Sequence, residues 1–221
     1  MFMFNVTLRT FQKDYNAHLL PTSNVQYAVG NRVEFDGVFR KKINFHPVYI
    51  TQYVELPDGL SDEIDGLFDE IHNSPPIPAS MMSIDITREQ DFEAALTIPA
   101  LNLDLGGKVD LNRVRKFSYD NVSSRVICRA AATLLKSGLE EIYPNRNARS
   151  ERFAFELFYA AKVTLHTEND YAAELKAEFD KAIIEFDGSV KLSGKNNEIL
   201  TFENGGLSPF ASRIESIGDM L

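Results

Sequence analysis

The sequence contains a single cysteine and no tryptophan among its 221 residues. Because Cys128 has no second cysteine to pair with, no disulfide can form within the chain, and a reducing compartment is favoured. No stretch approaches the roughly 18 consecutive apolar residues that a membrane-spanning helix needs. The first residues, Met1 to Phe4, lack the basic region and the cleavage site of a signal peptide, so we expect a cytoplasmic location. Tryptophan is common at membrane interfaces, but sixteen phenylalanines and eight tyrosines can serve there instead.

Recognisable catalytic motifs are also absent from the sequence. There is no Walker loop, dinucleotide-binding glycine fingerprint or nucleophile elbow. The four histidines, at positions 18, 46, 72 and 166, do not have the spacing of metal ligands. The carboxylates alternate along expected strands or lie on solvated helix faces, so no two of them stand out as an acid–base pair. We therefore expect a protein that is not an enzyme and has no metal or cofactor.

The net charge of −9 is unevenly distributed. Residues 1–50 hold six Lys or Arg against three Asp or Glu, and residues 106–152 hold ten against five. Residues 51–93 hold eleven acidic residues and a single arginine. An acidic chain with two basic segments does not suit nucleic-acid binding. Such segments suit an anionic membrane surface, where a well-placed Lys or Arg contributes about 1 kcal/mol, although ordinary solvated charge explains each residue equally well.

The strongest pattern in the chain is the alternation over residues 153–167. Apolar or uncharged residues occupy every second position, which is the period of a strand. The positions between them hold Glu156, Lys162, Thr164, His166 and Glu168, with Phe158 and two alanines mixed in. The run is far longer than the five or six residues usual for a globular strand. The uncharged row comprises Phe153, Phe155, Leu157, Tyr159, Ala161, Val163, Leu165 and Thr167.

The next segment, from Tyr171 to Phe186, satisfies two patterns at once. Its apolar residues fit the stripe of a helix, yet the same residues also alternate with acidic and basic ones as in a strand. A second strand is expected to follow, with one face made of Ile184, Phe186, Gly188, Val190 and Leu192. Strand, ambivalent helix and strand is the pattern expected of a hairpin that can lengthen.

The rest of the chain predicts an α+β fold, a twisted and mostly antiparallel sheet with surrounding helices, in a single domain over residues 1–221. We expect a basic amphipathic helix over residues 4–15 and two strands between Val25 and Val54. Another helix is expected over residues 61–72, with Ser61 as its N-cap. The most apolar helix is expected over residues 122–142. Gly106-Gly107 and Gly205-Gly206 are expected to be turns, and the C-terminal tail has helix-compatible spacing.

Two parts of the chain echo each other. Residues 103–111 (LDLGGKVDL) resemble residues 184–192 (IEFDGSVKL), and similar segments precede and follow each copy. We interpret them as two related hairpin units, over about residues 81–119 and 153–203, separated by the helix of residues 122–142. Two amphipathic hairpins per subunit can build a transmembrane barrel by oligomerisation, because a strand needs only about 9–11 alternating residues to cross a bilayer.

In the order of these elements, the chain resembles the pore-forming N-terminal domain of the gasdermin family. The resemblance rests on the basic first helix, the basic-aromatic segment Phe39 to Phe45, the two hairpin units and the segment Phe117 to Ser123 before a helix. It implies a protein that binds acidic lipids, oligomerises and inserts its hairpins as a membrane pore, which causes lytic cell death in innate immunity (pyroptosis).

The resemblance also implies which residues do this. Lipid contact would fall on Arg9, Lys13, Phe39, Arg40, Lys41, Lys42 and Phe45. The membrane-inserting hairpin would use Phe153, Phe155, Leu157, Tyr159, Val163, Leu165, Ile184, Phe186, Val190 and Leu192. A charge on the lipid-facing row, as in Leu157→Lys or Val163→Lys, should abolish leakage from anionic liposomes while the protein still folds.

The sequence departs from the family pattern because it shows no C-terminal inhibitory domain and no long cleavable linker, so we expect either a processed fragment or a short gasdermin such as those of fungi and simple animals. The cysteine near the N-terminus that is lipidated in bacterial members is missing as well. Restraint would then come from an inactive homodimer, a partner subunit or redox chemistry. Cys128 is either the site of an intermolecular disulfide or a small buried apolar residue. Two further alternatives remain open. One is a soluble lipid- or protein-binding module with a half-exposed sheet and no pore activity, and the other is a hydrolase of unrecognised type.

Overall fold

The computed structural model describes residues 9–20, 27–36, 42–54, 56–85, 97–98, 103–104, 113–142, 151–185, 190–195 and 197–220. These residues form α1 (Arg9–Tyr15), β1 (His18–Leu19), β2 (Asn31–Asp36), β3 (Lys42–Tyr49), η1 (Ile50–Gln52), α2 (Leu60–Asn73), β4 (Ile77–Pro78), β5 (Met82–Asp85), β6 (Thr97–Ile98), β7 (Leu103–Asp104), β8 (Val114–Asp120), β9 (Ser123–Val126), α3 (Arg129–Ile142), β10 (Arg152–Thr167), α4 (Tyr171–Glu185), β11 (Val190–Lys195), β12 (Ile199–Ser216) and α5 (Ile217–Met220). The architecture is α+β with mostly antiparallel strands, which confirms the predicted fold class.

The chain divides into two compact units that are each built from three stretches of sequence. The first unit takes residues from Met1–Ser23, Pro78–Ser123 and Phe158–Phe210, and the second from Asn24–Ile77, Ser124–Leu157 and Ala211–Leu221. The two longest strands, β10 and β12, therefore give residues to both units.

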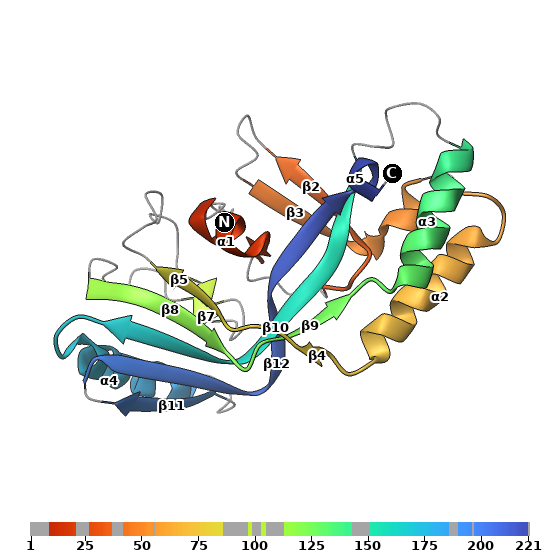
Figure 1. Ribbon diagram of the computed structural model, residues 1–221. Helices are drawn as coiled ribbons and strands as arrows, with labels where there is room; N and C mark the ends of the chain where they lie inside the picture. Colours follow the sequence, from red (N-terminus) through yellow and green to blue (C-terminus); the bar gives the residue numbers. More distant parts are fainter. Residues whose placement is uncertain are drawn as a thin grey trace. The chain divides into compact units, whose positions relative to one another are not determined.

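In the first unit, β8 pairs with β5 on one side and with β10 on the other, both antiparallel. β11 and β12 form an antiparallel hairpin, and α4 packs against β11 (Figure 1). Large aromatic side chains fill this core, among them Tyr119, which stacks on Phe210 with 4.0 Å between ring centroids. Asn197, with a φ of 54°, makes the tight turn of the β11–β12 hairpin.

In the second unit, β2 and β3 form an antiparallel pair, and α2 and α3 lie side by side (Figure 1). Phe68 of α2 is fully buried and tilts against the ring of Tyr49, with 5.1 Å between centroids. The close approach of α2 requires Gly30, because a Cβ there would lie 2.5 Å from the Phe68 ring. Gly30 also has a φ of +88°, which few other residues adopt without strain.

The structure confirms the long strand and the ambivalent helix. β10 runs over sixteen residues without a glycine or proline, and its aromatic and β-branched side chains favour an extended backbone. α4 begins at Tyr171, where its alanines, leucine and charged residues favour a helix. The two strands predicted between Val25 and Val54 are β2 and β3. The first predicted helix is present from Arg9 to Tyr15, and its first half lies outside the described residues.

Three predicted element boundaries are wrong. The helix of residues 122–142 begins only at Arg129, because the serines and β-branched residues before it form β9. The N-cap of α2 is Gly59 rather than Ser61, with a φ of 79°. The basic-aromatic segment, which the resemblance makes a loop, is a strand from Lys42 to Phe45, because β3 begins at Lys42; residues 39–41 lie outside the described residues.

The strand predicted to start at Ile184 is also wrong, because α4 continues to Glu185 and β11 starts at Val190. The tail is not helical up to Ser216 but forms β12, eighteen residues long, and Gly205-Gly206 lie inside this strand instead of at a turn. The two echoing segments differ in structure as well. Leu103–Asp104 is strand β7, whereas the matching Ile184 and Glu185 are helical. Gly106-Gly107 and most of the predicted hairpin of residues 81–119 lie outside the described residues.

Candidate functional site

The candidate site is β10 with the helix that follows it. On the uncharged row, Phe153, Leu157, Val163 and Leu165 are fully buried and Tyr159 is nearly so. Two residues of this row are half-exposed, Phe155 and Ala161. Their neighbours on the other row, Glu156 and Lys162, are half-exposed too. The strand therefore carries no charge on one row and keeps most of that row away from water.

In the first unit, β10 is held along its edge by β8. Leu165 lies opposite Phe117, and the antiparallel register runs from Lys162 opposite Asp120 to Thr167 opposite Val114. Thr164 donates a hydrogen bond from its hydroxyl to Asp120, at 2.8 Å. The other row of β10, which we call the polar row, holds Glu156, Lys162, Thr164 and His166. The pairing with β8 anchors this row by side-chain hydrogen bonds as well as by backbone hydrogen bonds.

His166, on the polar row, lies opposite Lys116 in the same pairing. Burial lowers the pKa of His166, and the charge of Lys116 lowers it further, while Asp120 opposes both effects. The imidazole is therefore neutral over a wider pH range than a solvated histidine. Its ring lies 3.4 Å from the hydroxyl of Ser118.

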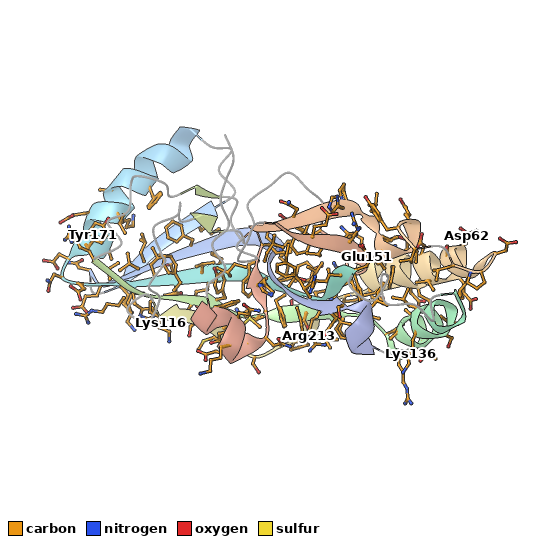
Figure 2. The ribbon with its side chains drawn as sticks, turned by 90° about the horizontal axis from the view of Figure 1, so that it is seen from above. Asp62, Lys116, Lys136, Glu151, Tyr171 and Arg213 are labelled. Atoms are coloured by element: carbon orange, nitrogen blue, oxygen red, sulfur yellow. The ribbon has the colours of Figure 1, made fainter. Side chains whose placement is uncertain are left out.

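In the second unit, Arg213 of β12 contacts the polar row of β10. Arg213 pairs with Glu156 at 3.2 Å, and its guanidinium lies 4.5 Å from the centre of the Phe155 ring (Figure 2). Ser212 donates a hydrogen bond to the carbonyl of Glu156 at 3.0 Å. The half-exposed residues on both rows thus contact the same stretch of β12.

The junction between β10 and α4 carries a dense set of polar contacts, all within the first unit. Arg113 forms two hydrogen bonds with the carboxylate of Glu174, at 2.7 and 3.2 Å. Its guanidinium also lies 4.1 Å from the centre of the Tyr171 ring, at the start of α4 (Figure 2). Arg115 of β8 pairs with Glu168 at 3.2 Å.

The opposite side of the junction is held by the β11–β12 turn. Asn197 donates from its side chain to Asp170 at 3.1 Å and accepts a backbone bond from Ala172 at 3.1 Å. Thr167 donates its backbone N–H to the carbonyl of Glu198 at 2.8 Å. The first turn of α4 is therefore attached both to β8 and to the β11–β12 hairpin.

Further along α4, apolar side chains decide which face is buried. Ala172, Leu175 and Phe179 are buried, and the ring of Phe179 meets Phe202 edge-on at 5.3 Å. Ala173 and Ala177 are exposed. Of the two patterns that the segment satisfies, the helical one is realised here.

The residues predicted for lipid contact lie in different surroundings. Lys13 of α1 is exposed, in the first unit. Phe45 of β3 is buried in the second unit, edge-on against Tyr27 at 5.1 Å. Arg9 opens α1 and Lys42 opens β3, but the structure describes neither side chain. Phe39, Arg40 and Lys41 lie outside the described residues. The predicted lipid role of all seven stays a prediction.

The residues predicted for the second strand of the hairpin are divided between two elements. Ile184 belongs to α4, whereas Val190 and Leu192 belong to β11. Phe186 lies outside the described residues. A continuous inserted strand over these positions would therefore require the end of α4 to unwind.

Cys128 is a half-exposed free thiol between β9 and α3. It lines a cavity of about 290 Å³ together with Leu67, Ile71, Ile77 and Val126 of the second unit. Partial exposure is compatible with an intermolecular disulfide, which stays a prediction.

Sequence reasoning missed the cluster formed by Arg113, Arg115, Glu168 and Glu174. An alternating pair of arginines gives no signal until the fold places it beside the start of α4. Within the described residues, no three His, Cys, Asp or Glu side chains gather as metal ligands would. None of the described helices has both the length and the hydropathy needed to cross a membrane.

No family model and no curated protein matches this chain. One solved structure, of a bacterial gasdermin from Bradyrhizobium tropiciagri, is similar over 94% of this chain and 87% of that chain, with 9% sequence identity and a TM-score of 0.45. Membership of the gasdermin family stays a prediction, and the function proposed below is argued from the residues of this chain.

Proposed function

We propose that this protein permeabilises membranes. It binds a surface of acidic lipids, assembles with further copies of itself, and inserts β10 together with the segment after it as a hairpin. The activity is mechanical rather than catalytic, and pore formation would lyse the cell that holds the protein.

The observation that supports this proposal best is the uncharged row of β10. The strand has sixteen residues, more than the about 9–11 that cross a bilayer. From Phe153 to Thr167 no charged residue falls on that row, whereas Glu156 and Lys162 lie on the other. A buried face of a soluble sheet also excludes charge, so it is the length of this row, beyond the roughly five or six residues of the usual globular strand, that favours the proposal.

The resting fold accounts for how such a row stays in solution. In this fold Phe153, Leu157, Val163 and Leu165 are fully buried, so these apolar side chains contact protein instead of water. A membrane would offer the same side chains an equally apolar surrounding. The cost of leaving the core is then largely offset by lipid contact.

Ala161 offers the sharpest test, because it lies on the uncharged row and is half-exposed in the resting fold. A lysine at this position can reach water before insertion, whereas Leu157 and Val163 are fully buried and a lysine there would disrupt the fold itself. At the centre of a bilayer, each lysine on the lipid face costs about 2–4 kcal/mol. We expect Ala161→Lys to abolish dye release from vesicles of phosphatidylcholine and phosphatidylserine.

The matched control is Ala161→Met, which adds a side chain of similar length without a charge. It should leak like the wild type, and both variants should unfold at the same urea concentration within experimental error. Equal leakage from the lysine and methionine variants would contradict the proposal. It would favour the alternative of a soluble binding module.

A further inference from the structure

The junction of β10 and α4 contains two arginines whose partners belong to the segment that must move. Arg115 lies in β8 and Arg113 directly precedes this strand, and both side chains form ion pairs at the junction with α4. Their partners are Glu174, in the first turn of α4, and Glu168, in the turn before it. The proposed function requires this segment to leave β8, and these pairs must then break.

The exposure of the four side chains shows that solvent and other anions can reach them. Arg113 and Arg115 are 36% and 60% exposed, and Glu174 and Glu168 are 59% and 44% exposed. Ion pairs in such surroundings contribute little net stability, because water solvates both charges well. A competing anion with the right geometry can therefore replace the carboxylates.

The geometry around Arg113 defines which anion suits the site. Its two terminal nitrogens face the two oxygens of Glu174, the bidentate arrangement that a guanidinium also makes with a phosphate. The Tyr171 ring supports the guanidinium from one side. Arg115 adds a second guanidinium at the same junction, where it pairs with Glu168.

We propose that Arg113 and Arg115 form a binding site for the phosphate groups of acidic lipids, which Glu168 and Glu174 mask in the resting fold. At an anionic membrane, lipid phosphates replace the two carboxylates, and the same surface repels Glu168 and Glu174. The start of α4 is thereby released from β8. The consequence, release of the hairpin segment, rests on the proposed function, whereas the binding site does not.

A membrane suits this site better than free phosphate does. Lipid phosphates are held at high density on a surface. Their collective negative potential attracts the arginine of each ion pair and repels the glutamate. A dissolved phosphate ion can bind an arginine but exerts no such repulsion on the glutamates. Lipid phosphate should thus release the start of α4 from β8, whereas free phosphate should not.

Removing the masking charges tests the site directly. In Glu168→Gln/Glu174→Gln, both side chains keep their size and polarity, and the arginines are left without carboxylate partners at these positions. The control, Glu198→Gln/Glu203→Gln, makes the same charge change at two exposed residues of the same unit. Sedimentation with phosphatidylcholine vesicles of graded phosphatidylserine content should show half-maximal binding of the first variant at about half the phosphatidylserine that the control needs. Equal midpoints for the two variants would overturn the proposal.

A second variant and a second readout keep the test independent of leakage. Arg113→Gln/Arg115→Gln should lower binding to vesicles with 20% phosphatidylserine several-fold, and unchanged binding would overturn the proposal. In the wild type, amide hydrogen exchange over residues 171–175 should accelerate on these vesicles but not with inorganic phosphate at the same phosphate concentration. Equal acceleration of amide exchange by inorganic phosphate would contradict a site whose effect on α4 requires a membrane surface.

Measuring dye release distinguishes a failure of the proposed arginine–phosphate site from a failure of the proposed pore formation. If the wild type leaks normally while the glutamine variant behaves like its control, the masked site is wrong and the pore stands. If binding depends on the four residues as expected but no variant leaks, the site is supported and the pore is contradicted.

Discussion

His18 of β1 is buried, with 8% of its surface exposed, and burial lowers its pKa from 6.5 to about 4. The folded protein therefore resists protonation of His18, whereas the unfolded chain accepts a proton near pH 6.5. The contribution of His18 is fully present above about pH 6.5 and is lost as the pH falls towards 4. This gap corresponds to up to about 3 kcal/mol of unfolding free energy.

We accordingly predict that the unfolding free energy of the wild type falls between pH 6.5 and pH 4 more steeply than that of His18→Gln. Urea titrations of both proteins at half-unit pH steps measure the difference. Parallel pH profiles would show that the His18 imidazole is solvated and titrates normally.

Gly30 is a second residue at which a small change should have a large effect. Gly30→Ala combines a left-handed φ with a Cβ that would lie 2.5 Å from the Phe68 ring. Gly59→Ala has a similar φ of +79° but no atom within 4 Å of the added carbon. Because both variants carry the backbone strain, their difference reports the clash, for which we expect about 1–3 kcal/mol. Thermal unfolding should thus place Gly30→Ala well below Gly59→Ala, and coincident melting temperatures would contradict the packing of α2 on Gly30.

At the scale of elements, the attachment of α4 to the β11–β12 hairpin rests on its apolar side chains. Phe179 contacts Phe202 edge-on, and both are buried. Phe179→Ala should cost about 3–5 kcal/mol and accelerate amide exchange over residues 171–179. On acidic vesicles, the same variant should release dye faster than the wild type, since α4 leaves its place more easily.

The control for this prediction is Phe68→Ala, which removes a fully buried phenylalanine from the other unit. It should cost a similar free energy and leave exchange over residues 171–179 unchanged at pH 7. If both variants loosen α4 equally, general instability rather than the attachment of α4 governs the exchange.

Elements with one strong periodicity could be predicted from the sequence, and elements defined by pairing could not. β10 and α2 carry a clear period of two or of 3.6, and both form where expected. β12 was missed because Gly205, Gly206 and Pro209 punctuate its alternation, and its partners in the sheet override those local signals. The sequence predicts β9 as part of a helix because a short apolar run next to alanines fits either structure.

The same limit applies to the candidate site. The uncharged row of β10 is visible in the sequence because its residues are neighbours along one strand. The cluster of Arg113 with Glu174 joins residues 61 positions apart, and only the antiparallel pairing of β8 with β10 brings them together. Contacts of this kind depend on register, which the sequence alone does not specify here.

At the scale of the whole molecule, we propose that β10 is stable in two different surroundings. In the resting fold the uncharged row is covered by protein, and in a membrane it would be covered by lipid. The other row, which holds Glu156 and Lys162 together with the buried Ala154, Phe158 and Ala160, would then face the lumen of a pore. Exchange between these two surroundings is the central claim.

The measurement that tests this claim most directly uses an environment-sensitive fluorophore at single cysteines in a Cys128→Ser background. Positions 155, 156, 161 and 162 are all half-exposed in the resting fold, so labels there disturb the core least. On vesicles containing phosphatidylserine, labels at 155 and 161 should shift to the blue and be quenched by brominated lipids, while labels at 156 and 162 stay aqueous. If all four labels respond alike, or none responds while the protein is bound, β10 does not insert and the account is wrong.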